Sequence, residues 1–69
     1  MELSARNVIK GTVKAIDTGA INVEVTIEIA PGQEITSILT KKSCERLGLA
    51  VGKEAYAIIK ASNVMLGTD

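Results

Sequence analysis

The clearest pattern in the chain is an alternation of apolar and polar residues between positions 21 and 29. Ile21, Val23, Val25, Ile27 and Ile29 are separated by single polar residues, which is the period of a strand with one buried face. Weaker alternation, rich in β-branched residues, predicts further strands over residues 2–6, 7–16, 34–40, 54–61 and 64–67. The pattern therefore predicts an all-β chain.

The breaks between these segments carry residues that favour turns. Gly11 lies inside an otherwise β-branched run and predicts a bend or bulge, as at a barrel corner. Residues 17–19 and 51–53 are typical of turns. Pro31 and Gly32 suit the two central positions of a type II turn. These breaks predict short strands joined by tight connections.

One segment leaves the two-residue period and predicts a short helical turn over 41–47. Thr40 is suited to be its N-cap and Gly48 to end it. Cys44 and Leu47 are three residues apart, which predicts that both face the core. Five or six short strands with one helical turn predict a small OB-like barrel, although a sandwich of equal strand number would show a similar pattern.

The composition and net charge of the chain argue against several classes of function. Eight Lys and Arg balance eight Asp and Glu, and Tyr56 is the one aromatic residue, so both the basic surface and the stacking platforms of nucleic-acid binding are missing. One cysteine, Cys44, and no histidine exclude an internal disulfide and argue against a zinc site. No serine has a histidine to activate it, so we predict that the chain is not an enzyme.

The length of 69 residues allows a single domain, which we place over 1–69. A chain of this size buries only about 60% of its unfolded surface and is marginally stable alone. Because disulfides, metals and large aromatic residues are missing, we expect a homo-oligomer. The start of the chain lacks the apolar segment of a signal peptide, and no run is long enough to span a membrane, so we expect a cytoplasmic protein with no membrane partner.

Three pairs of hydrogen-bond donors are spaced two or three residues apart: Ser4 with Arg6, Thr40 with Ser43, and Lys60 with Ser62. Residues two apart on a strand share a face, and the start of a helix favours an anion. None of the pairs contains a carboxylate, so together they suit a small, fully deprotonated oxyanion. Taken one at a time, each has an ordinary explanation as a solvated charge, a strand end or a helix cap.

Longer matches then identify a family. Residues 4–7 (SARN) followed by Lys10 and Gly11 resemble the start of molbindins, the Mop-type molybdate-binding proteins. The resemblance continues through residues 35–38, Ser43, 47–49 and 51–52, and it closes with 59–62 (IKAS) and 64–65. It covers the whole chain, and the combination of SARN near the start with KAS near the end is specific.

The resemblance implies a stand-alone Mop, or TOBE, domain that forms a hexamer, a trimer of dimers. It implies binding of molybdate, and of tungstate, at subunit interfaces for storage of molybdenum in the cytoplasm. No cofactor is implied, and the molybdenum is held as an oxyanion without direct metal ligands. Carried over to this sequence, the site consists of Ser4, Arg6, Lys60, Ala61 through its backbone, and Ser62, with Thr40 and Ser43 from the partner subunit. Asn7 belongs to the motif, but we assign it a local backbone contact and no ligand contact.

Three other functions compete with oxyanion storage. A regulatory module that senses the oxyanion while holding partners together is the main alternative. A nucleic-acid-binding OB-fold is disfavoured by the net charge of zero and the single aromatic residue. Binding of a pterin is disfavoured because its ring favours aromatic stacking or a larger apolar slot.

Overall fold

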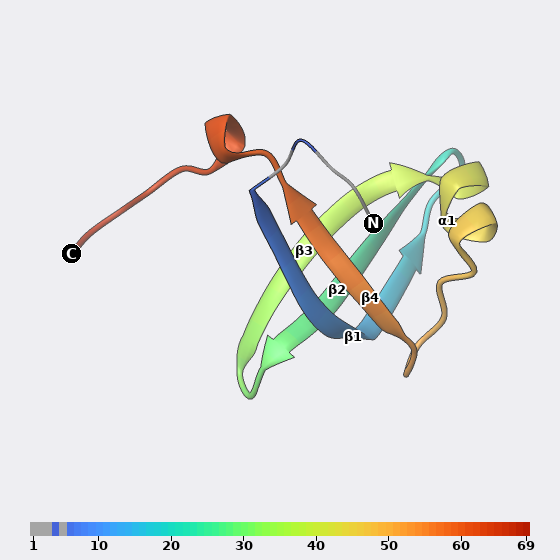
Figure 1. The fold of residues 1–69 in the computed structure, drawn as a ribbon. Helices are drawn as coiled ribbons and strands as arrows, with labels where there is room; N and C mark the ends of the chain where they lie inside the picture. Colours follow the sequence, from blue (N-terminus) through green and yellow to red (C-terminus); the bar gives the residue numbers. More distant parts are fainter. Residues whose placement is uncertain (1–3, 5) are drawn as a thin grey trace.

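The strands form one curled antiparallel sheet in a computed structural model that describes residues 4 and 6–69. In chain order the elements are β1 (Asn7–Thr18), β2 (Asn22–Ala30), β3 (Gln33–Thr40), α1 (Lys41–Leu47), β4 (Glu54–Ile59) and the 3-10 helix η1 (Ala61–Asn63). The sheet order is β3-β2-β1-β4. It curls into half of a barrel, with β3 and β4 as its two edges (Figure 1). The predicted all-β class and the single short α-helix are confirmed.

The strongest alternation in the sequence forms the centre of the core. Val23, Val25 and Ile27 of β2 are each at most 6% exposed, because β2 pairs with β1 on one side and with β3 on the other. Val13 of β1 and Cys44 of α1 are the other buried apolar residues within the described part of the chain. Partly buried apolar side chains from every strand pack around them. The core is therefore small for the number of apolar residues in the chain.

The turn between β2 and β3 forms at Pro31 and Gly32, as the sequence predicts. Ala30 pairs with Gln33 across the turn, and Gly32 has φ of +75°, the left-handed conformation that a type II turn requires at its third position. Gly52, in the predicted turn after α1, also has a positive φ, of +91°. Both turns are confirmed.

Gly11 lies where β1 changes partners, because β1 pairs with β4 up to Thr12 and with β2 from Thr12 onward, and Figure 1 shows β1 bent between these two halves. The irregularity in β1 lies at Lys14, where the pairing with β2 shifts between Val13 and Ala15. Gly11 is buried, and a Cβ at this position would lie 2.8 Å from the backbone oxygen of Glu28. The absence of a side chain is needed because β2 approaches β1 closely here. The predicted bend at Gly11 is thus confirmed, whereas the bulge lies three residues later, at Lys14.

Four strands, rather than five to six, occur in the described part of the chain. β4 ends at Ile59 instead of Ala61, and η1 follows it. Residues 64–67 do not form a strand, because they are not paired with any strand of the described residues. Of the predicted strand over 2–6, residues 2, 3 and 5 lie outside the described part, and Ser4 and Arg6 lie in bends.

The helix α1 matches its prediction at both ends but not on its inner face. Gly48 ends the helix in the left-handed conformation, with φ of +66°. Cys44 is buried as predicted, whereas Leu47 is 63% exposed. Leu47 is exposed because it lies beside an open groove on the inner side of the sheet, where no element covers it.

Candidate oxyanion-binding site

The first half of the candidate site lies at the end of the sheet where β1 begins and β4 ends. Asn7 and Ile59 are paired across these two strands, and the side-chain amide of Asn7 donates a hydrogen bond of 3.1 Å to the backbone oxygen of Ile59. Arg6 directly precedes this pair in one strand, and Lys60 directly follows it in the other. Antiparallel pairing therefore brings two cations that are 54 positions apart in the sequence to the same end of the sheet.

The chain after β4 keeps the remaining donors of this half close to the two cations. Lys60 is extended (φ −64°, ψ 134°) and begins η1. The backbone N–H of Asn63 donates to the Lys60 oxygen at 2.8 Å, and that of Val64 donates to the Ala61 oxygen at 3.3 Å. Both bonds hold residues 60–63 in a tight turn. Ala61 and Ser62 are exposed there, so they are accessible to a ligand.

Ser4 and Arg6 are also exposed. In the part of the chain that the structure describes, the ion pairs are formed by other residues, and neither Arg6 nor Lys60 has a carboxylate partner. Two cations at one edge without an acidic partner repel each other, and an anion between them would remove that repulsion.

The lysines of β1 are neutralised by carboxylates instead. Lys10 contacts Glu54 at 2.8 Å, and Lys14 contacts Glu34 at 2.6 Å and Glu28 at 3.6 Å. The hydrogen bond to Glu54, and then its charge, raise the pKa of Lys10; Glu34 raises the pKa of Lys14 in the same way. Because these pKa values are raised, both lysines keep their charge to higher pH than an isolated lysine, and the contribution of that charge to the pairs is lost as the pH rises past the lysine pKa. These lysines are therefore poor candidates for oxyanion ligands.

The second half of the candidate site surrounds the start of α1. Thr40 is the predicted N-cap: its Oγ1 accepts a hydrogen bond of 3.1 Å from the Ser43 backbone N–H. The Thr40 hydroxyl also donates to Ser43 Oγ at 3.0 Å. The Ser43 hydroxyl accepts in that bond, so its own proton remains available to a ligand.

A single chain does not bring the two halves together. Asn7 pairs with Ile59 at the start of β1, whereas Thr40 pairs with Asn22 at the other end of the sheet. The 12 residues of β1 separate the two ends, and Figure 1 shows η1 and α1 on different sides of the half-barrel. Thr40 and Ser43 would therefore have to come from another copy to join the other donors.

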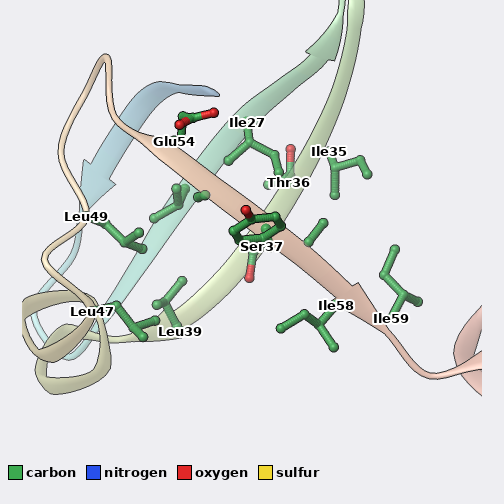
Figure 2. A pocket seen from close by; sticks show the side chains of 14 residues that line it. Ile27, Ile35, Thr36, Ser37, Leu39, Leu47, Leu49, Glu54, Ile58 and Ile59 are labelled. Carbon is green, nitrogen blue, oxygen red and sulfur yellow. The ribbon is translucent and has the colours of Figure 1, made fainter. Parts of the chain in front are cut away.

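A groove on the inner side of the sheet is unsuited to an oxyanion. It has a volume of about 510 Å³, with Leu39, Leu47 and Leu49 at one end and Ile58 and Ile59 at the other (Figure 2). Its one charged lining residue is a carboxylate, Glu54, which would repel an anion.

The described residues also contain no group of three or more His, Cys, Asp or Glu side chains placed to hold a metal ion. Neither helix within residues 4 and 6–69 combines the length and hydropathy needed to cross a bilayer.

The sequence model of the TOBE domain matches residues 3–66. The chain belongs to the TOBE-domain family. Molybdenum-pterin-binding protein 1 of Clostridium pasteurianum is 47% identical over 66 residues, which cover 96% of this chain and 97% of that protein. The predicted resemblance to the Mop proteins is thus confirmed.

Two solved structures share the fold. The cytoplasmic molybdate-binding protein ModG, solved with molybdate bound, is 55% identical with a TM-score of 0.93; the match covers 100% of this chain and 49% of ModG. A molybdate-binding protein from Sporomusa ovata is 28% identical with a TM-score of 0.90, over 99% of this chain and 100% of that one. The TOBE domain described here spans about half of ModG.

Within this TOBE domain, the side chain of Asn7 contacts the backbone of Ile59, 52 positions away, rather than the local backbone that the sequence predicts. Sequence reasoning missed the consequence of that contact. By tying the start of β1 to the end of β4, Asn7 brings the chain positions of Arg6 and Lys60 to the same end of the sheet. The position of Asn7 directly after Arg6 in the SARN segment is the sequence feature that could have indicated this role.

Thr40→Ala is expected to lower the free energy of unfolding by about 1 kcal/mol, the usual loss when an N-cap hydroxyl is removed. Thr40→Ser retains the hydroxyl that accepts from Ser43, so it should unfold like the unchanged domain. Urea unfolding followed by circular dichroism measures both variants. Equal stability of all three proteins would show that the cap contributes nothing.

Proposed function

We propose that this TOBE domain, a single Mop domain over 1–69, binds molybdate, and also tungstate, as a store of the oxyanion in the cytoplasm. The observation that carries the proposal is the pairing of Asn7 with Ile59, which puts Arg6 and Lys60 at one edge of the sheet. The relatives named for binding molybdate or molybdenum-pterin, and the description of ModG as cytoplasmic, support it.

The chemistry of the ligand explains the choice of residues. A tetrahedral dianion offers only acceptors, so its best surroundings are donors alone. Arg6 and Lys60 supply charge-assisted hydrogen bonds, which are roughly twice as strong as neutral ones. The Ser4 and Ser62 hydroxyls and the Ala61 backbone N–H add neutral donors. The function is binding, and no step of catalysis is assigned to these groups.

The site is completed at an interface between copies of the chain. Thr40 and Ser43 lie at the far end of the sheet from Arg6, so we assign them to the partner subunit of a homo-oligomer, a hexamer built as a trimer of dimers. Between subunits, the anion also offsets the repulsion of cations that would oppose association. Molybdate binding and assembly should then support each other.

Molybdate is expected to raise the thermal stability of the domain. A ligand that binds only the folded protein adds about 2.7 kcal/mol when it is present at a hundred times its dissociation constant. Thermal unfolding at fixed protein concentration, with molybdate, sulfate or neither, measures the effect. A melting temperature that does not move at saturating molybdate would contradict the proposal.

Isothermal titration with molybdate, tungstate, sulfate and a pterin, in parallel, tests the ligand directly. Heat of binding with the first two oxyanions and little with the pterin is the expected result. Sulfate has the same charge and shape in a smaller size, so its affinity reports how closely the site fits. Binding of the pterin alone would overturn the proposal.

The alternative is a regulatory module that senses the oxyanion and holds a second protein. The two proposed functions differ in the partner: a storage protein needs only copies of itself, whereas a regulatory module also binds a different protein. Affinity purification with and without molybdate, followed by mass spectrometry, separates them. A different protein recovered only in the presence of molybdate would favour the regulatory module.

A further inference from the structure

The side-chain hydrogen bond of Asn7 lies at the last pair of residues between β1 and β4. Asn7 and Ile59 end the register of the two strands at this end of the sheet, and their hydrogen bond of 3.1 Å is partly buried. Among the described residues it is the side-chain hydrogen bond that joins the most distant positions, 52 apart in the sequence. Because strand ends fray first, a bond at the final pair limits the separation of the two strands where the candidate site begins.

The two cations beyond this pair have few restraints of their own. Arg6 is exposed in a bend, and Lys60 is exposed directly after β4. The 3-10 helix that follows Lys60 has no side-chain cap, and the ion pairs of the described residues include neither cation. The spacing of Arg6 and Lys60 in the chain therefore depends on the pair that separates them, Asn7 with Ile59.

We propose that Asn7 is a positioning residue that sets the selectivity of the oxyanion site for molybdate over sulfate, an inference that rests on the proposed function. The two ions have the same charge and shape and differ in size, so the same donors suit both. Selection by size requires donors that keep their spacing when the smaller ion binds, and hydrogen bonds behind the binding residues supply such rigidity. The Asn7 bond to the Ile59 backbone supplies it for Arg6 on one side and Lys60 on the other.

The chemistry of an amide suits this role. An asparagine side chain donates a hydrogen bond without carrying charge, so it holds the Ile59 oxygen and leaves the charge of the two cations to the ligand. An ionised aspartate of the same size cannot donate, and its charge would oppose an anion nearby. A leucine of similar size has no donor. The bond to Ile59 therefore requires this residue type at position 7, although Asn7 itself contacts no ligand in the proposal.

The test is the ratio of the molybdate and sulfate affinities in folded variants. Asn7→Leu removes the donor, and Asn7→Thr, which suits a strand, has a hydroxyl one bond too short to replace the amide. Gly11→Ala is the control, because it strains the contact with the Glu28 backbone and lowers stability away from the site. Isothermal titration gives the molybdate affinity, and its decrease with rising sulfate at constant ionic strength gives the sulfate affinity. Both Asn7 variants should lower the ratio about fivefold, the change expected for one neutral hydrogen bond, and Gly11→Ala should leave it unchanged.

The outcomes separate this role of Asn7 from the proposed function. If the unchanged domain does not bind molybdate, the proposed function is wrong, and the selectivity assigned to Asn7 is wrong with it. If the domain binds molybdate and the Asn7 variants keep the ratio, only the role of Asn7 is wrong. An equal loss of affinity for both ions also contradicts the role, because it shows a general effect on the site. A lowered ratio in Gly11→Ala as well would mean that selectivity follows overall stability, which overturns the role of Asn7.

Discussion

Arg6→Ala is expected to weaken molybdate binding about ten- to hundredfold. Arg6 precedes and Lys60 follows the Asn7–Ile59 pair, at the same end of the sheet. A hydrogen bond to a charged group contributes about 1.5–3 kcal/mol, which corresponds to that change in affinity. Isothermal titration of the folded variant gives the ratio. The affinity of Arg6→Lys for molybdate should lie between those of the unchanged domain and Arg6→Ala, because lysine keeps the charge and lacks the forked geometry of the guanidinium.

The matched control is Arg46→Ala. Arg46 is exposed in the last turn of α1, outside the candidate site, and its removal changes the net charge by the same amount. Unchanged affinity in the Arg6 variant would remove Arg6 from the site. An equal loss in both variants would mean that net charge, and not a specific contact, attracts the oxyanion.

Gly11→Ala is expected to destabilise the domain by about 1–3 kcal/mol, the usual cost of an added group in a packed interior. The new Cβ would lie 2.8 Å from the Glu28 backbone oxygen and 3.1 and 3.2 Å from the side chains of Ile29 and Ile27. The oxygen belongs to β2, so relief requires the two strands to separate. For a domain of 60–100 residues, each kcal/mol lowers the melting temperature by about 4–8 °C.

Gly67→Ala is the control for this prediction. No atom lies within 4 Å of a Cβ at Gly67, so this variant should melt close to the unchanged domain. Both variants are compared at one protein concentration, since association makes the melting temperature depend on it. If Gly11→Ala melts no lower than Gly67→Ala, the close approach of β1 and β2 is not a constraint on the fold.

Local signals in the sequence were sufficient where a short segment decides its own structure. The alternation from Val23 to Ile27 predicted the central strand, because burial of one face has a period of two residues. Thr40 and Gly48 predicted the ends of α1, because each satisfies backbone groups within one turn of itself. Gly32 predicted a turn that needs a positive φ.

Signals of the same kind failed where the outcome depends on a neighbour distant in sequence. Gly11 predicts a bend, but it does not predict the close approach of the Glu28 backbone, which the missing side chain permits. Residues 64–67 read as a strand, yet a strand needs an adjacent edge, and the single chain provides none there. Leu47 reads as a core residue, but the groove beside it is open.

For the candidate site, the sequence by itself determined which groups are present: two cations, hydroxyls and no carboxylate, in segments that identify the family. Only the tertiary structure decided their arrangement. It joins Arg6 to Lys60 through the pairing of β1 with β4 and holds Thr40 and Ser43 at the other end of the sheet. The ability to donate a hydrogen bond is a property of each residue and is visible in the sequence. The placement of Arg6 and Lys60 at one end of the sheet, 54 positions apart in the sequence, depends on strand pairing, which no local pattern predicts.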